Sequence, residues 1–230
     1  MSPKKALVLG TLLLVPVLVF LFLKMFGVNR FSLRTHFPVR VDSTLVDGQW
    51  RYDTTYRQVP DFRLVSQNGA SFTAKELEGK IYVANFFYTS CAANCKQMST
   101  QLSRVQDAFR LKPNVKILSF SLRPEEDSPE VLKRYAESFR ANPYKWVFLT
   151  GSSAEILRLA QQGYNLQTTD SVSTGKAEPV SPQNLYLVDQ QKHVRGIYDG
   201  TSAADVDRLI TEINVLLSED NTDNGKQSPR

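Results

Sequence analysis

The two cysteines of the chain, Cys91 and Cys95, are the residues whose type and spacing point most directly to chemistry. In a regular helix, residues four apart lie on one face with Cα atoms roughly 6 Å apart, a separation that a disulfide can bridge. Two thiolates on one face could instead bind a soft metal such as Cu(I). A structural zinc site needs two further nitrogen or sulfur ligands, and the chain has only two histidines. The pair is therefore predicted to be a redox or metal-binding site rather than a zinc site.

A purely stabilising disulfide is the main alternative for this pair. A crosslink stabilises a protein more when it closes a longer loop, and this one would close only residues 91–95. A structural crosslink would more naturally join distant segments. Two inert buried cysteines form a second alternative, but the expected position of the pair between a strand and a helix favours reactivity.

The neighbouring elements are predicted to place the cysteines at the start of a helix. Residues 81–88 (IYVANFFY) form a nearly continuous apolar run, typical of a strand that is covered on both faces. Apolar residues then recur at helical spacing: Met98, Leu102, Val105 and Phe109. The helix is expected to begin near Cys95, so the thiols would lie beyond the carboxyl end of a strand, where ligands collect. Free amides at the helix start would favour a thiolate, and Lys96 could add to this.

Strands and helices alternate through the rest of the domain. Further strands are expected at residues 115–122, 146–150, 185–189 and 194–198. Ser128 with Pro129 is a typical helix start, and Ser152 with Glu155 could form a capping box for a helix that ends at Gly163. A last amphipathic helix carries six apolar residues: Val206, Leu209, Ile210, Ile213, Leu216 and Leu217. The order β-α-β-α-β-α-β-β-α predicts an α/β fold of the thioredoxin-like kind, a central mixed sheet flanked by helices.

The amino-terminal segment has the pattern of a transmembrane helix. Residues 6–23 carry no charge, and 18 residues of helix span roughly 27 Å, close to the thickness of a bilayer core. Lys4 and Lys5 precede the run, which predicts a cytoplasmic amino end and an extracytoplasmic (periplasmic or equivalent) domain. Lys24 and Arg30 follow the run and oppose this orientation. A cleaved signal peptide is the alternative, but its apolar region would be shorter and would end in small residues.

These patterns divide the chain into four parts. Residues 1–25 are expected to be a cytoplasmic end and single-pass anchor, 26–58 a tether, 59–217 the folded domain, and 218–230 a disordered tail without large apolar residues. The formal net charge is +5, and no basic stripe is interleaved with aromatic residues, so nucleic-acid binding is not expected.

The sequence resembles the SCO/SenC family over residues 59–217. The stretch FFYTSCAANCKQM resembles the copper-site loop of that family, and DFRLVSQNGASFTAKELEGK resembles its entry hairpin. Three later stretches, beginning at residues 117, 146 and 185, resemble its remaining strand–helix units. The resemblance implies a membrane-anchored thioredoxin-like domain that binds copper through Cys91, Cys95 and a distant histidine. It also implies a role in cytochrome c oxidase assembly, or in some members thiol-disulfide reduction.

The chain departs from the family pattern at three positions. The position of the copper-binding histidine is occupied by Ser181, whose hydroxyl is a poor copper ligand. Arg123 stands where the family usually has an aspartate, and Lys96 where a proline usually follows the second cysteine.

Three other side chains were considered as substitutes for the missing ligand. His193 is predicted to be an exposed turn residue about 17 Å from Ser181, the length of a five-residue strand. His36 lies in the tether, where nothing positions it. Met98 has a soft thioether, but its place in the apolar helical series favours core packing.

Three functions remain open from the sequence. The first is a thiol-disulfide oxidoreductase in which Cys91 is the exposed nucleophile and Cys95 the resolving thiol. The second is a metallochaperone that holds Cu(I) on the two thiolates and delivers it to an oxidase, and the third is a non-catalytic assembly protein with a simple disulfide. The expected partners are the membrane and a protein such as an oxidase subunit or another thiol protein.

Overall fold

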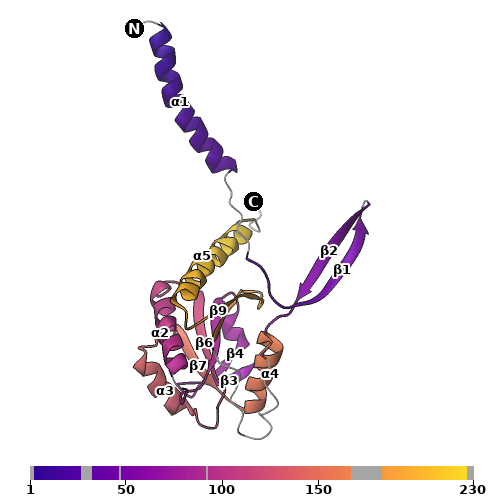
Figure 1. Cartoon of the computed structure of the whole chain (residues 1–230), viewed down its shortest axis with the longest axis vertical. Helices are drawn as coiled ribbons and strands as arrows, with labels where there is room; N and C mark the ends of the chain where they lie inside the picture. The colour runs from indigo at the N-terminus through magenta and orange to yellow at the C-terminus, as the bar shows by residue number, and fades with distance from the viewer. Residues whose placement is uncertain (1–2, 27–32, 47, 92, 167–182, 227–230) are drawn as a thin grey trace. The chain divides into compact units, whose positions relative to one another are not determined.

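The computed structural model describes residues 3–26, 33–46, 48–91, 93–166 and 183–226. The chain separates into two compact units, Met1–Ser32 and Leu33–Arg230 (Figure 1). The first unit contains helix α1 (Pro3–Phe26), so the helix predicted over residues 6–23 is present. Within the described residues, no helix has both the length and the apolar character that crossing a membrane requires.

The second unit is built on a seven-stranded sheet with the order β4-β3-β7-β6-β5-β8-β9. The strands β5 (Ile81–Phe87), β6 (Val115–Ser121) and β7 (Trp146–Thr150) run parallel to one another. The remaining four strands pair antiparallel: β3 (Arg63–Ser66), β4 (Ser71–Thr73), β8 (Asn184–Val188) and β9 (Val194–Asp199). The predicted mixed sheet is therefore confirmed, with β5 in its interior.

Helices cover both faces of the sheet, because alternate residues of β5 belong to different cores. Ile81, Val83 and Phe87 belong to one core, which α2 (Ala93–Ala108), α3 (Pro129–Ser138) and α5 (Ala203–Lys226) complete. Tyr82, Ala84 and Phe86 belong to the other, which contains α4 (Ser153–Tyr164) and the short helix η1 (Ala74–Leu77). Every residue of β5 is buried, as the apolar run of residues 81–88 predicted. The layered arrangement is the thioredoxin-like one (Figure 1).

The predicted helix starts are confirmed, whereas one predicted end is wrong. Ser128 caps α3 by accepting a hydrogen bond from the Val131 amide, and Ser152 caps α4 in the same way from the Glu155 amide. Helix α4 ends at Tyr164, one residue after Gly163, and Asn165 forms its C-cap in the left-handed conformation. Gly163 is needed instead for packing, because an added Cβ would lie 3.2 Å from Pro60.

The segment predicted as a tether, residues 26–58, contains an antiparallel hairpin. Its strands are β1 (Pro38–Val46) and β2 (Gln49–Tyr56), with Gly48 at a positive φ beside the tip. Leu45 pairs with Trp50, and Tyr52 follows on the same face two residues later; all three are more than half exposed. The pattern was missed because the alternation is short and neither face of the ribbon is buried, so it lacks the apolar runs that mark the central strands.

Residues 218–230 were predicted to be a disordered tail. This prediction is wrong for residues 218–226, which continue helix α5. Glu219 holds this extension, because its carboxylate accepts a hydrogen bond from the Leu33 amide at 3.1 Å and pairs with Arg195 at 3.4 Å. Both contacts depend on residues far away in the sequence. Residues 227–230 lie outside the described part of the chain.

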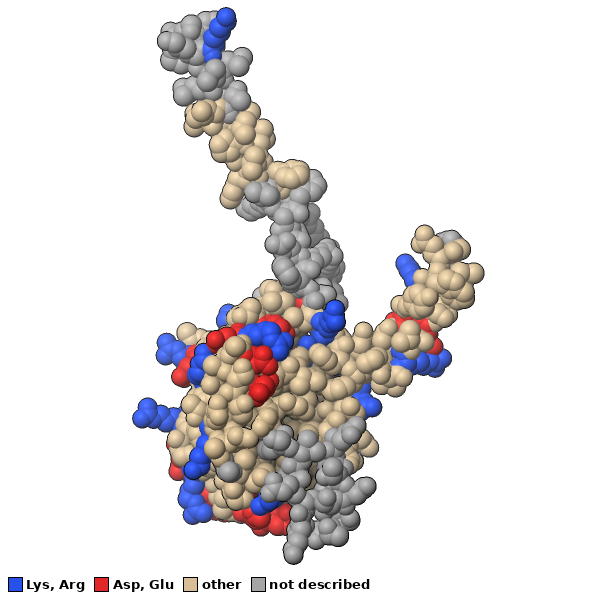
Figure 2. Space-filling view, in the orientation of Figure 1, with Lys and Arg blue, Asp and Glu red and all other residues tan. Residues whose placement is uncertain are grey.

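Basic and acidic side chains are intermixed on the face of the second unit that Figure 2 presents. On the described residues of this face, neither charge forms a continuous area. On this face, the formal net charge of +5 is not concentrated in one basic patch.

Candidate functional site

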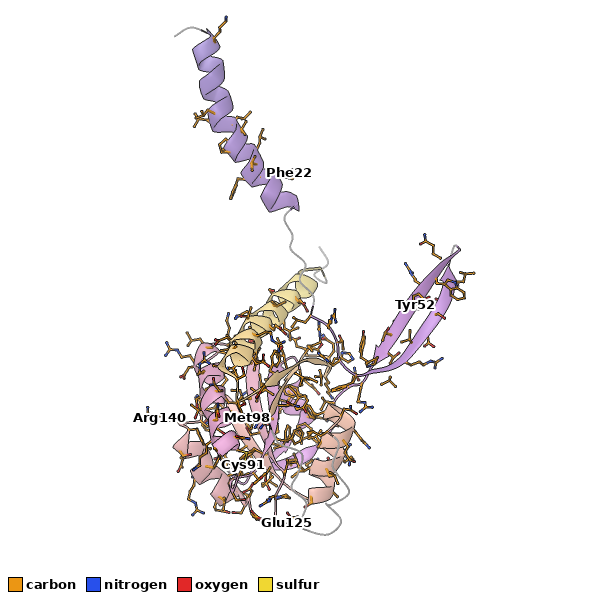
Figure 3. All side chains as sticks on the ribbon, in the orientation of Figure 1. Phe22, Tyr52, Cys91, Met98, Glu125 and Arg140 are labelled. Atoms are coloured by element: carbon orange, nitrogen blue, oxygen red, sulfur yellow. A yellow bond between two sulfur atoms is a disulfide. The ribbon has the colours of Figure 1, made fainter. Side chains whose placement is uncertain are left out.

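The two cysteines lie where the sequence predicted, between strand β5 and helix α2. Strand β5 ends at Phe87 and α2 begins at Ala93, so Cys91 precedes the helix and Cys95 lies in its first turn. The two sulfur atoms form a disulfide, and the Cα atoms are 5.8 Å apart, close to the value expected for residues four apart on a helix. Figure 3 places Cys91 at the same end of the unit as Glu125.

The two sulfurs differ in their access to solvent. Cys91 is 9% exposed, whereas Cys95 is completely buried among the apolar residues of the core that α2 completes. Of the two residues, Cys91 is therefore the more accessible to an external thiol or disulfide. This confirms the predicted order of exposure, with Cys91 the outer member of the pair.

A buried carboxylate holds the loop that leads to Cys91. Asp127 is fully buried, and its carboxylate oxygens accept hydrogen bonds from the Thr89 amide at 3.2 and 3.3 Å and from the Thr89 hydroxyl. The Ser121 hydroxyl, at the end of β6, also donates to this carboxylate. Sequence reasoning missed Asp127, because an acidic residue in the run Glu125–Asp127 reads as exposed. Only the helix-start pattern at Ser128, one residue later, marks this loop as structured.

Arg123, one of the departures from the family pattern, contributes to the rim of the same site. Its guanidinium carbon lies 4.3 Å from the centroid of the Tyr88 ring, a cation–π arrangement. The guanidinium also donates to the Ser90 hydroxyl at 3.3 Å and pairs with Glu126 at 3.4 Å. Glu126 in turn accepts a hydrogen bond from Ser90 at 2.9 Å. The arginine therefore binds the loop before Cys91 from its outer side.

Neither histidine is brought to the cysteines. The His36 amide donates to the Val194 carbonyl at 2.8 Å, and Val194 pairs with Val188, which pairs with Tyr82 near the start of β5. The cysteines follow the opposite end of β5, so His36 and the cysteines lie at opposite ends of the strands. Burial lowers the pKa of His36, and Arg34 acts in the same direction, while Glu212 partly opposes both.

His193 lies at the same far end as His36. Its backbone forms an isolated antiparallel β-bridge with Gln58, and its ring packs edge-on against Tyr56. Its Nδ1 atom lies 3.9 Å from Asp189 Oδ1. The side chain is 26% exposed, so His193 is more buried than the prediction of an exposed turn residue implied. At this end of the sheet it lies too far from the cysteines to bind a metal with them.

Met98 packs in the core, as predicted. It is fully buried, and the Asn85 amide nitrogen lies 3.8 Å from its sulfur, within hydrogen-bonding distance for sulfur. The Ser119 hydroxyl donates to Asn85 at 2.6 Å, and the Trp146 indole donates to Ser119 at 2.8 Å. The thioether therefore ends a buried polar chain beneath helix α2.

The described residues offer two sulfur donors for a metal, with no histidine, further cysteine or acidic residue grouped with them as a third ligand. No group of three or more histidine, cysteine or acidic residues within the described ranges could hold a metal ion. Ser181, which the sequence comparison predicted at the position of the family's histidine, lies outside the described residues. Once reduced, two thiolates on one helix start are a donor set that suits Cu(I), a soft ion that accepts low coordination numbers.

A disulfide between the interior strand of a thioredoxin-like sheet and the helix that follows, with one cysteine slightly exposed and the other fully buried, defines a thiol-pair protein of this fold. The model of the SCO1/SenC family matches residues 51–218, and the chain belongs to that family. The SCO1 protein homolog of Bacillus subtilis is 27% identical over 168 residues, which cover 72% of this chain and 86% of the relative.

Three solved structures place this fold among Sco proteins. A SCO1/SenC family lipoprotein from Bacillus anthracis is 27% identical, with 70% of this chain and 95% of that chain covered and a TM-score of 0.62. BsSco, described as a cytochrome c oxidase assembly protein with a disulfide switch, is 27% identical over 70% and 93% of the two chains, with a TM-score of 0.59. Arabidopsis thaliana ScoI, solved with copper bound, is 25% identical over 70% and 98%, with a TM-score of 0.57.

Proposed function

We propose that the Cys91–Cys95 pair carries out thiol-disulfide exchange with a protein partner during the assembly of cytochrome c oxidase. The observation that carries this proposal is the difference between the two residues: Cys91 is 9% exposed and Cys95 is fully buried. Such a pair can accept a partner at one sulfur only, while the other stays in position to release it. The oxidase as the setting rests on family membership and on the described role of BsSco.

The exchange balances without another reactant. In the reduced protein, the Cys91 thiolate attacks a disulfide of the partner, forming a mixed disulfide and releasing one partner thiolate. The Cys95 thiolate then attacks Cys91 Sγ, which forms the intramolecular disulfide and releases the second partner thiolate. The partner gains two electrons and the pair loses two. The reverse sequence regenerates the dithiol from a partner dithiol, and free amides at the start of α2 favour the thiolates in both directions.

Delivery of Cu(I) by the same pair is the second candidate. It is supported by a copper-bound structure in the family and by two sulfurs that reduction frees side by side. Copper would then be cargo, held by Cys91 and Cys95. Cu(II) binding should be weak, because Ser181 replaces the imidazole that the family provides.

A trapping experiment with glutathione disulfide as the probe tests the exchange. The full-length Cys95→Ala variant should retain glutathione as a stable mixed disulfide on Cys91, detected by mass spectrometry. The wild type should release both glutathione molecules and close its own disulfide. The matched Cys91→Ala variant should react far more slowly, because Cys95 is buried. Equal modification of the two variants, or a wild-type disulfide that resists every biological reductant, would contradict the proposal.

A copper titration separates the two candidates. The reduced full-length protein is titrated with Cu(I) and with Cu(II), as wild type and as Ser181→His. Tight Cu(I) binding that is lost in Cys91→Ser would support delivery, and a new Cu(II) site in Ser181→His would identify position 181 as the vacated ligand position. Tight Cu(II) binding by the wild type would contradict the assignment of Ser181.

We further propose that helix α1 attaches the protein to a membrane as a single anchor, with the domain on the extracytoplasmic side. The support is its apolar surface: the large apolar side chains of residues 12–22 are about half exposed or more. A lipoprotein in the family agrees with a membrane-attached setting. Fractionation of cells that express the full chain, compared with a chain lacking residues 1–26, tests the attachment.

A further inference from the structure

We propose that Asp127 is a positioning residue for the thiol pair: its buried carboxylate fixes the turn before Cys91 and thereby favours closure of the Cys91–Cys95 disulfide. The inference rests on the proposed thiol-disulfide exchange and adds to it a residue outside the Cys-x3-Cys motif. Asp127 lies 36 residues after Cys91 in the sequence, in the connection between β6 and α3.

The position of Asp127 is fixed by its own connection. Its backbone amide donates to the Arg123 carbonyl at 2.9 Å, and the next residue, Ser128, caps helix α3. The side chain is fully buried, and its donors are the Thr89 amide, the Thr89 hydroxyl and the Ser121 hydroxyl. The carboxylate is therefore held between the end of β6 and the loop that follows β5.

Burial of this carboxylate has an unfavourable free energy of desolvation, since every group that donates a hydrogen bond to it is neutral. Within the described residues Asp127 makes no ion pair, although Arg123 is close in sequence and pairs with Glu126 instead. A charge removed from water without an opposite charge must be compensated by hydrogen bonds of good geometry. Asp127 obtains two of these from Thr89, so the free energy of its burial is coupled to the conformation of that residue.

Thr89 belongs to the turn that presents Cys91. The Cys91 amide donates to the Tyr88 carbonyl at 3.1 Å, so Tyr88 to Cys91 form one turn with Thr89 inside it. If Thr89 is fixed in the reduced protein too, Cys91 stays close to Cys95 and its effective concentration toward Cys95 is high. Loss of the contact would give the turn more freedom, and disulfide closure would then cost more conformational entropy. The contacts of Asp127 are with Thr89 and Ser121, not with the sulfurs, so its effect acts through the turn.

The test compares disulfide equilibria in full-length variants. Asp127→Asn removes the charge and one acceptor, Thr89→Val removes only the hydroxyl donor, and Asp107→Asn is the matched control, since Asp107 is an exposed carboxylate on α2. Each protein is equilibrated in dithiothreitol buffers of graded ratio, and the oxidised fraction is read by alkylation and mass spectrometry. The equilibrium constant for closure should fall roughly tenfold in Asp127→Asn, about 30 mV for a two-electron couple. It should fall in the same direction in Thr89→Val and stay within about twofold in Asp107→Asn, the scatter expected of an uncoupled surface site.

Thermal unfolding of the oxidised and reduced forms distinguishes positioning from general structural support. Positioning predicts that Asp127→Asn destabilises the oxidised form more than the reduced form, because the two differences are linked by a thermodynamic cycle. Equal destabilisation, with an unchanged equilibrium constant in both Asp127→Asn and Thr89→Val, would overturn the inference. If Asp127→Asn does not fold, Thr89→Val alone decides, since it keeps the buried carboxylate and one of its Thr89 donors.

A different result would refute the proposed function, namely a wild-type disulfide that does not exchange with glutathione. In that case the closure constants of the variants could still be compared in dithiothreitol, which is a stronger reductant. Exchange of the wild type with glutathione, combined with identical constants for wild type and variants, would refute the role of Asp127 and leave the proposed function standing.

Discussion

Reduction of the Cys91–Cys95 disulfide is expected to leave the protein folded, because the bond closes a very short loop. The two residues are four apart in sequence, and the loop-entropy relation gives about 2 kcal/mol for a five-residue loop. The sheet and both cores are formed by residues elsewhere in the chain, and Cys91 and Cys95 lie at the edge of one of them. The bond is thus a small part of the stabilisation of the domain.

In a domain of this size, 1 kcal/mol shifts the melting temperature by roughly 2–4 °C. Reduction should therefore lower the melting temperature by about 4–8 °C. The measurement is circular dichroism in the near and far ultraviolet, with and without excess dithiothreitol. The near-ultraviolet signal should persist in the reduced protein at 25 °C, since Trp146 is fully buried and stacks on Phe148, both in strand β7, which the disulfide does not crosslink.

The control is the Cys91→Ala/Cys95→Ala double variant, whose melting temperature should not respond to the reductant. Alanine is preferred to serine at position 95, because that side chain is fully buried and a hydroxyl would need a partner there. A fall of about 20 °C or more in the reduced wild type, or loss of its near-ultraviolet signal, would refute the reasoning. The bond would then be a structural crosslink, and exchange at Cys91 would unfold the domain.

Two further predictions concern side chains that the sequence raised as ligands. Because Met98 is fully buried, Met98→Ala should lower the free energy of unfolding by about 2–5 kcal/mol, and Met98→Leu by less than about 1.5 kcal/mol, as measured by chemical denaturation. Cu(I) affinity should be the same in the wild type and in Met98→Leu. A lower affinity in Met98→Leu would identify the thioether as a ligand. Burial lowers the pKa of His36, so the unfolded state takes up a proton first as the pH falls through 6.5, and the free energy of unfolding should decrease from pH 7.5 to 5.5. Urea titrations should show a weaker decrease in His36→Asn, and an identical or steeper one would contradict the assignment.

Local patterns were sufficient to predict the elements that position the cysteines. Strand β5 is buried at every residue, so it appears in the sequence as a continuous apolar run, and the buried face of α2 appears as a helical series. The capping serines of α3 and α4 are likewise local signals. The position of the thiol pair followed from these neighbours. Its Cα separation of 5.8 Å is close to the helical value on which the prediction was based, although Cys91 precedes helix α2.

The parts that could not be predicted depend on contacts between distant residues. Asp127 is 38 residues from Thr89, and Glu219 is 186 residues from Leu33. From the sequence alone each of these acidic residues is predicted to be exposed, because its hydrogen-bond donors are brought close only by the fold. The hairpin of β1 and β2 presents a different difficulty, since neither of its faces enters a core and its apolar residues remain exposed.

The departures from the family pattern take on a physical meaning when the loop before Cys91 is considered residue by residue. Tyr88 packs under the Arg123 guanidinium, Thr89 binds the Asp127 carboxylate, and Ser90 donates to Glu126. All three partners come from the single connection between β6 and α3. An aspartate at position 123 could not form the cation–π contact, so the arginine belongs to a different way of holding this turn. The three residues of the turn before Cys91 are therefore each held by the same connection, and this arrangement supports the proposed exchange at Cys91.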